Sequence, residues 1–114
     1  MGAERVMTVF VDVDDTLVRS FGSKQMVMPG SVESVRRLAA AGNVVLYCWS
    51  SGGGEYARSV CERLGIAGLF AGFLPKPDLM IDDQPPSDWK GLVVLHPNEF
   101  DGDAASIRSG LGWT

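Results

Sequence analysis

An apolar segment near the N-terminus ends in a cluster of carboxylates, and this feature constrains the fold most. Residues 6–11 are apolar apart from one threonine, as expected for a strand buried on both faces of a parallel sheet. Asp12, Asp14 and Asp15 follow directly. Like charges this close repel one another, so a cation or a function must compensate for them. Because ligands bind at the carboxyl ends of strands in open α/β sheets, the cluster predicts a metal-assisted phosphate or carbonyl site.

Length, charge and cysteine usage limit the classes of protein to which the chain can belong. The 114 residues fit one domain, and the net charge of −4 argues against nonspecific binding of nucleic acid. No apolar run approaches the ~20 residues of a membrane span, and the N-terminal segment lacks a signal-peptide pattern. Cys48 and Cys61 lie in strand-like and helix-like segments and are expected to be reduced, buried thiols. We therefore expect a single cytoplasmic domain over residues 1–114, with no membrane partner.

Strand-like and helix-like segments alternate along the rest of the chain. Apolar runs predict four further strands, at residues 44–49, 69–74, 79–81 and 92–95. Capping residues and apolar stripes predict three helices, at residues 31–41, 55–64 and 103–109. The mixed segment 18–29 is more typical of a bent hairpin or flap than of a helix. Alternating units of this kind predict an α/β fold with a mostly parallel, five-stranded sheet and helices on both faces.

Polar side chains that suit phosphoryl transfer follow several of these predicted strands. They are Asp12 and Asp14, Ser50 and Ser51, Lys76, and Asp82 and Asp83. Because the carboxyl ends of parallel strands share one edge of a sheet, we expect these groups to converge there. Aspartate can attack phosphorus, Mg²⁺ prefers carboxylate and phosphate oxygens, and a lysine and a hydroxyl can stabilise the charge on the phosphoryl oxygens.

The same groups resemble the four sequence motifs of the haloacid dehalogenase superfamily, in the order that the family has them. DVDDTL at residues 12–17 resembles its DxDx(T/V) first motif, and WSSG at residues 49–52 resembles its Ser/Thr second motif. PKP at residues 75–77 resembles the lysine motif, and LMIDD at residues 79–83 resembles the acidic fourth motif. The resemblance covers about two-thirds of the chain. It implies a three-layer α/β/α Rossmann-like fold.

The resemblance implies a role for each charged residue of the motifs. Asp12 would be the nucleophile and a Mg²⁺ ligand. Asp14 would protonate the leaving group and then activate water, and its backbone carbonyl would contact Mg²⁺. Lys76 would neutralise the phosphoryl group. Asp82 and Asp83 would complete the metal site.

The serine that fills the second motif stays open at this point. A strand that ends at Trp49 favours Ser50 as the phosphoryl contact, whereas the glycines that follow favour Ser51. Backbone amides from Gly52 onward can face a phosphate at the N-terminus of the next helix. Ser51 and Gly52 are therefore substrate-binding candidates, together with Thr16, which would brace the first-motif loop.

The segments between the motifs have no room for the cap domain that family members usually insert. The resemblance therefore implies an open, capless phosphomonoester hydrolase that is Mg²⁺-dependent and forms an aspartyl-phosphate. Its substrate would be a phosphorylated small molecule or a macromolecular end, and a homo-oligomer could supply a lid. The alternative is a degenerate module that binds phosphate or metal without turnover. Arg19, Lys24 and His96 are either substrate contacts or solvated side chains.

Overall fold

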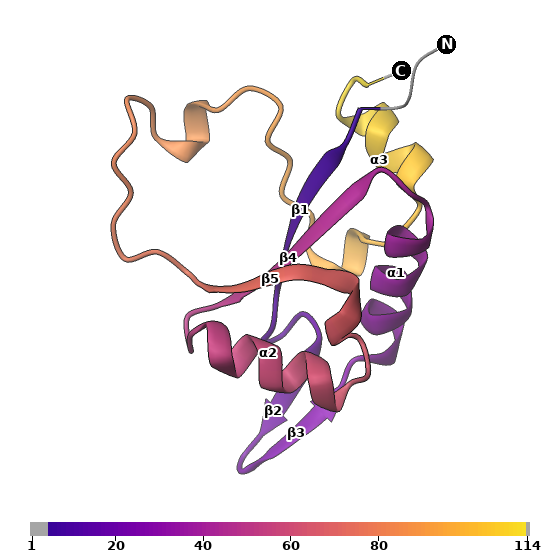
Figure 1. The fold of residues 1–114 in the computed structure, drawn as a ribbon, viewed down its shortest axis with the longest axis vertical. Coiled ribbons are helices and arrows are strands. Elements are labelled where there is room, and N and C mark those ends of the chain that lie inside the picture. Colours follow the sequence, from indigo (N-terminus) through magenta and orange to yellow (C-terminus); the bar gives the residue numbers. More distant parts are fainter. Residues whose placement is uncertain (1–4, 114) are drawn as a thin grey trace.

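A three-stranded parallel sheet carries the fold of the computed structural model, which describes residues 5–113 (Figure 1). Its strands are β1 (Met7–Asp12), β4 (Val44–Ser50) and β5 (Phe70–Pro75), with β4 in the centre. β1 pairs with β4 along its whole length, and the register places Asp12 opposite Trp49. All three strands therefore end at the same edge of the sheet. The three strands predicted around these residues are confirmed.

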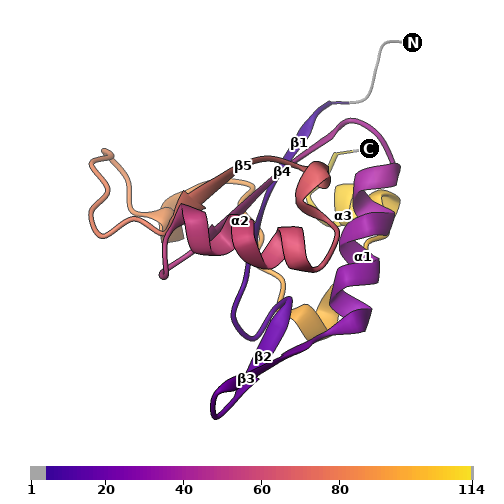
Figure 2. The ribbon, with the colours of Figure 1, turned by 60° about the horizontal axis from the view of Figure 1, so that its bottom comes forward.

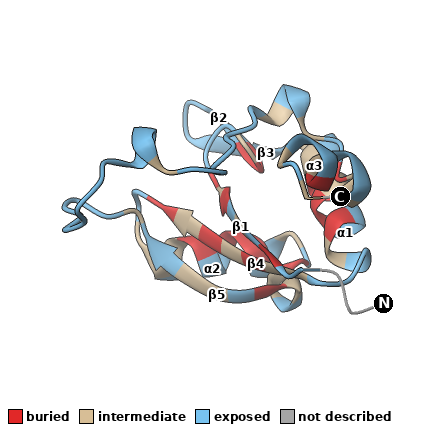
Figure 3. Ribbon diagram, turned by 90° about the horizontal axis from the view of Figure 1, so that it is seen from above, coloured by how far each residue is buried: buried red, intermediate tan, exposed pale blue. Residues whose placement is uncertain are grey.

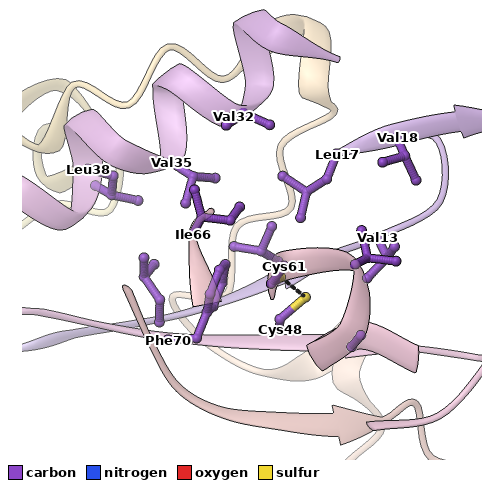
Figure 4. Packing of buried hydrophobic residues seen from close by; sticks show 14 of the residues in the cluster. Val13, Leu17, Val18, Val32, Val35, Leu38, Cys48, Cys61, Ile66 and Phe70 are labelled. Atoms are coloured by element: carbon purple, nitrogen blue, oxygen red, sulfur yellow. Dashed lines mark hydrogen bonds between the residues drawn. The ribbon is translucent and has the colours of Figure 1, made fainter. Parts of the chain in front are cut away.

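Helices α1 (Pro29–Ala40) and α2 (Gly54–Arg63) connect the three strands. The buried side chains of α1, at Val32, Val35 and Leu38, follow the spacing of a single apolar stripe. They join one core with buried residues of α2 and with alternate residues of β4 (Figure 4). Both predicted helices are confirmed to within two residues, and α1 begins early because Pro29 suits the first position of a helix.

Cys48 and Cys61 lie within this core, one on β4 and one on α2. Both are free and fully buried, and a hydrogen bond at 3.7 Å connects the sulfur atoms of Cys61 and Cys48 (Figure 4). The hydrogen bond with Cys61 and burial both raise the pKa of the Cys48 thiol. Both residues pack as small buried thiols in the core, as the sequence predicts.

The segment between β1 and α1 forms an antiparallel hairpin, which we call the flap. Its strands are β2 (Val18–Phe21) and β3 (Lys24–Val27). Gly22 has a φ of +61° in the connecting turn, a conformation that costs glycine little. The flap lies next to α2 (Figure 2). The predicted hairpin over residues 18–29 is confirmed.

The structure differs from the five-stranded prediction after β5, because residues 79–81 and 92–95 form no strand. Instead, residues 76–96 form a long exposed loop with a short 3₁₀ turn, η2 (Pro86–Asp88) (Figures 1 and 3). Ile81 and Val94 are 94% and 84% exposed. The two apolar runs are short and lie between prolines, which lack the N–H needed for continuous pairing. Within the described residues, the parallel sheet therefore has three strands, and β1 is an edge strand.

The last described helix, α3 (Ala104–Gly110), confirms the short helix predicted at residues 103–109. The Arg108 side chain of α3 donates to the Asn43 carbonyl, just before β4, at 2.9 Å. The Arg37 side chain of α1 donates to the Asp101 carbonyl and lies 3.9 Å from the Asp103 carboxylate. Within residues 5–113, no helix is long and apolar enough to cross a membrane.

Candidate active site

A tight turn after β1 presents the first two aspartates. The Val13 carbonyl accepts hydrogen bonds from the N–H groups of the residues at positions 16, 17 and 18, at 3.2, 2.8 and 3.2 Å. Val13 and Leu17 are fully buried, so the turn is fixed to the core at both ends. Asp15 adopts a left-handed φ of +60°, which aspartate tolerates better than most residues. The apolar core thus fixes the backbone between Asp12 and Asp14.

Asp12 lies in direct contact with Lys76, although the two are far apart in the sequence. The Lys76 ammonium is 3.0 Å from Asp12 Oδ1, and the Thr16 hydroxyl donates to Asp12 Oδ2 at 3.2 Å. The Lys76 N–H also donates to the Ser50 carbonyl at 2.9 Å, which ties the end of β5 to the end of β4. The side chains of Asp12 and Lys76 are 33% and 37% exposed. An ion pair this exposed contributes only about 0–1 kcal/mol to stability, so its placement at the sheet edge is the informative property.

Ser50 and Ser51 differ sharply in their surroundings. Ser50 is the last residue of β4 and is fully buried, whereas Ser51 is exposed. The Ser50 hydroxyl oxygen accepts the Gly52 N–H at 3.0 Å and therefore keeps its own proton for donation. The Ser50 carbonyl accepts the Gly53 N–H at 3.1 Å. Ser50 therefore organises the glycine loop before α2, and Ser51 and Gly52 lie exposed on that loop.

Asp14 contacts a residue for which the sequence patterns predict no role in the site. The Tyr56 hydroxyl, on the first turn of α2, donates to Asp14 Oδ1 at 2.7 Å. Gln25 of the flap donates to the Tyr56 oxygen at 2.6 Å, and Arg63 donates to Gln25 at 2.5 Å. Burial and the hydrogen bond to Asp14 raise the pKa of Tyr56. The only sequence signal for Tyr56 is its place on the first turn of a helix that follows a motif-bearing strand.

The acidic pair of the fourth motif does not join the other site residues in this structure. Asp82 and Asp83 lie exposed in the long loop, where Asp82 Oδ1 accepts the Gln84 N–H at 3.0 Å. Residues 5–113 contain no cluster of three or more acidic, histidine or cysteine side chains suited to hold a metal ion. Mg²⁺ needs only one or two carboxylates besides phosphate oxygens and water. Asp12 is the one predicted donor whose carboxylate lies in contact with other site residues at the sheet edge, and Asp82 and Asp83 stay apart from it.

Arg19 and His96, two further candidates from the sequence, have structural partners. Arg19 lies 3.9 Å from Asp15 on the exposed side of the turn. His96 Nδ1 accepts the Asn98 N–H at 3.1 Å and caps the short 3₁₀ turn η3 (Pro97–Glu99). Neither residue has a contact with Asp12 or Asp14 among those that the structure describes.

The start of α2 approaches β5 so closely that it requires a glycine. A Cβ on Gly54 would lie 2.7 Å from the Phe73 carbonyl oxygen, a backbone atom that cannot swing away. We expect Gly54→Ala to lower the free energy of unfolding by about 1–3 kcal/mol, in the range of overpacked cores. Gly30→Ala in α1 is the matched control, because a Cβ there meets nothing within 4 Å. Urea unfolding of both variants checks this, and equal stability would contradict the close approach.

Comparisons of this chain with protein-family models, with curated proteins and with solved structures find no match.

Proposed function

We propose that this chain is a Mg²⁺-dependent phosphomonoester hydrolase of the haloacid dehalogenase type, with an open site and an aspartyl-phosphate intermediate. The contact between Asp12 and Lys76, at 3.0 Å, is the observation that carries the proposal. A carboxylate beside an ammonium and a hydroxyl, at the carboxyl edge of a parallel sheet, is an arrangement that suits attack on an anionic phosphate. Thr16 completes it by holding the second carboxylate oxygen.

The proposed reaction has two steps, with one role for each residue. An Asp12 oxygen attacks phosphorus, the bond from phosphorus to the alcohol oxygen breaks, and Asp14 gives its proton to that oxygen. Asp14 then takes a proton from water, which attacks the aspartyl-phosphate and releases inorganic phosphate and free Asp12. Lys76 offsets the negative charge of the transferring group, and the buried Ser50 organises the glycine loop beside it. Bound Mg²⁺ would supply further positive charge at the phosphate oxygens.

The proposal includes a five-stranded, three-layer form of the fold, in which residues 79–83 pair with the free edge of β1 and residues 92–95 add the fifth strand. An exposed strand edge offers unpaired N–H and C=O groups, and Leu79 and Ile81 are 77% and 94% exposed. A cavity of about 680 Å³ has residues of β1, α1 and α3 in its lining, together with Met80 and Val93 of the loop. Pairing along this edge would carry Asp82 and Asp83 toward the end of β1 and the metal donors there.

A second candidate function is a module of the same fold that binds phosphate or metal without turnover. The separation of Asp82 and Asp83 from Asp12 favours it. The two functions differ in p-nitrophenyl phosphate hydrolysis with Mg²⁺ and with EDTA. The enzyme shows metal-dependent turnover and traps beryllofluoride at Asp12. A binding module shows neither, and binds phosphate in a Mg²⁺-dependent manner instead.

Tyr56 is expected to position Asp14 for proton transfer. Tyr56→Phe removes one hydrogen bond to a carboxylate and should lower kcat/KM for alkyl phosphates about tenfold, which corresponds to about 1.4 kcal/mol. Turnover of p-nitrophenyl phosphate should fall much less, because p-nitrophenolate leaves without a proton. Tyr47→Phe, on β4, is the control, because Tyr47 contacts Phe10 through its ring. Steady-state kinetics on both substrates check this, and an equal loss on both would contradict the role.

A further inference from the structure

A second cavity, of about 560 Å³, lies between the flap and helix α2. The flap contributes Ser20, Ser23, Lys24 and Gln25 to its lining, and α2 contributes Tyr56 and Arg63. Hydrogen bonds from Gln25 to Tyr56 and from Arg63 to Gln25 connect the flap with α2, which lies above it in Figure 1. Hydrogen-bond donors therefore dominate this cavity, unlike the apolar cavity beside β1.

The charge of the cavity is positive, in a chain whose net charge is −4. Lys24 and Arg63 line it, and no carboxylate does. Neither cation forms an ion pair with any residue in the range 5–113, whereas Arg19, Arg37 and Arg58 all do. Two cations that face one hollow without an acidic partner fit an anion, because a guanidinium and an ammonium bind carboxylate and phosphate oxygens well.

A continuous chain of hydrogen bonds connects this cavity with Asp14. It runs from Arg63 to Gln25 at 2.5 Å, from Gln25 to Tyr56 at 2.6 Å, and from Tyr56 to Asp14 at 2.7 Å. Asp14 is the proposed proton donor to the leaving oxygen. The alcohol part of a bound substrate would therefore begin beside Asp14 and Tyr56, and the cavity is the hollow that Tyr56 also lines.

We propose that the cavity between the flap and α2 binds an anionic group, a carboxylate or a second phosphate, on the alcohol part of the substrate. Lys24 and Arg63 contact that group, and Tyr56 and Gln25 form the wall between it and Asp14. This inference rests on the proposed phosphatase activity. It narrows the substrate class to phosphomonoesters with a second negative charge on the leaving group.

Three esters with one carbon skeleton test the inference: 1,3-propanediol monophosphate, 1,3-propanediol bisphosphate and 3-phosphooxypropanoate. Their far ends are neutral, phosphate and carboxylate. We expect the wild type to prefer one or both anionic esters about tenfold or more in kcat/KM. Lys24→Gln and Arg63→Gln should each lower kcat/KM more for the anionic esters than for the neutral ester, and so remove most of that preference. Arg58→Gln on the same helix is the matched control, because Arg58 pairs with Glu55 outside the cavity.

The outcomes separate a failure of the cavity proposal from a failure of the proposed enzyme. Two results would overturn the cavity proposal without affecting the proposed phosphatase activity. One is equal kcat/KM of the wild type on all three esters. The other is an equal loss of kcat/KM on all three esters in Lys24→Gln and Arg63→Gln. If no ester is turned over, NMR titration with phosphonate analogues of the three esters decides. Shifts at residues 24, 25 and 63 that only the anionic analogues produce, and that Lys24→Gln weakens, support the cavity without the enzyme. The absence of such shifts would overturn both proposals.

Discussion

Asp12→Asn is expected to reduce turnover of p-nitrophenyl phosphate on the order of 10⁴-fold. The carboxamide has almost the same shape as the carboxylate and can still accept the hydrogen bond from Thr16, but it is not a nucleophile toward phosphorus. The fold should persist, since the substitution removes only a partly exposed ion pair with Lys76, worth about 0–1 kcal/mol. Steady-state kinetics in saturating Mg²⁺, together with urea unfolding, check both expectations.

Asp15→Asn is the matched control for this prediction. Asp15 is an aspartate on the same turn, but its side chain is 79% exposed and contacts Arg19 only at 3.9 Å. We expect its turnover to remain within about twofold of the wild type, as for other exposed surface substitutions. If Asp12→Asn kept more than a tenth of the wild-type kcat while remaining folded, Asp12 would not be the nucleophile. Equal losses in both variants would instead indicate a general effect of charge at this turn.

The sequence predicts the three paired strands and the helices well because each depends on a pattern that is local. β1, β4 and β5 are apolar runs, and α1 has one apolar stripe. The meeting of Asp12 and Lys76 also follows from the sequence, because parallel strands connected by helices must end at one edge. That inference needs no knowledge of how the side chains pack.

The hydrogen bonds of Asp14 could not be predicted in the same way. Tyr56 falls on the regular spacing of a buried helix face, and periodicity does not reveal that its hydroxyl reaches Asp14. Gln25 and Arg63 belong to two different elements, and their contact depends on how the flap packs against α2. Such contacts depend on how separate elements pack against each other, and the spacing of residues along the sequence does not reveal this packing.

The predicted strands at residues 79–81 and 92–95 failed for a different reason. A strand is stable only when it pairs, and a three- or four-residue apolar run between prolines carries little tendency of its own to extend. The composition of such a run does not show whether the run pairs as a strand or stays in a loop. The exposed side chains at Ile81 and Val94 show that both runs lack a partner here.

Removal of divalent metal with EDTA is expected to lower turnover to background, and excess Mg²⁺ should restore it. The physical reason is repulsion, because the Asp12 carboxylate and a phosphate dianion carry like charges and Lys76 is the cation in contact with Asp12. One ammonium cannot neutralise both groups, and a divalent ion at the phosphate oxygens can offset the remainder. Turnover that persists in EDTA at the level of the Mg²⁺-containing sample would contradict the metal requirement.

Asp82→Asn tests whether the acidic pair joins that metal. We expect the Mg²⁺ concentration for half-maximal activity to rise about 10–100-fold, because a lost carboxylate weakens the metal site without removing the nucleophile. Asp88→Asn is the control, since Asp88 is an exposed aspartate of the same loop, in η2. Hydrogen exchange with Mg²⁺ and beryllofluoride should show new protection at residues 79–82 and at the free edge of β1, because pairing there would satisfy backbone groups that are exposed in the three-stranded sheet. The activity of the two variants could instead depend identically on Mg²⁺ concentration, with no new protection from exchange. The metal would then be bound by residues at the end of β1 alone, and the loop would stay apart from the sheet during turnover.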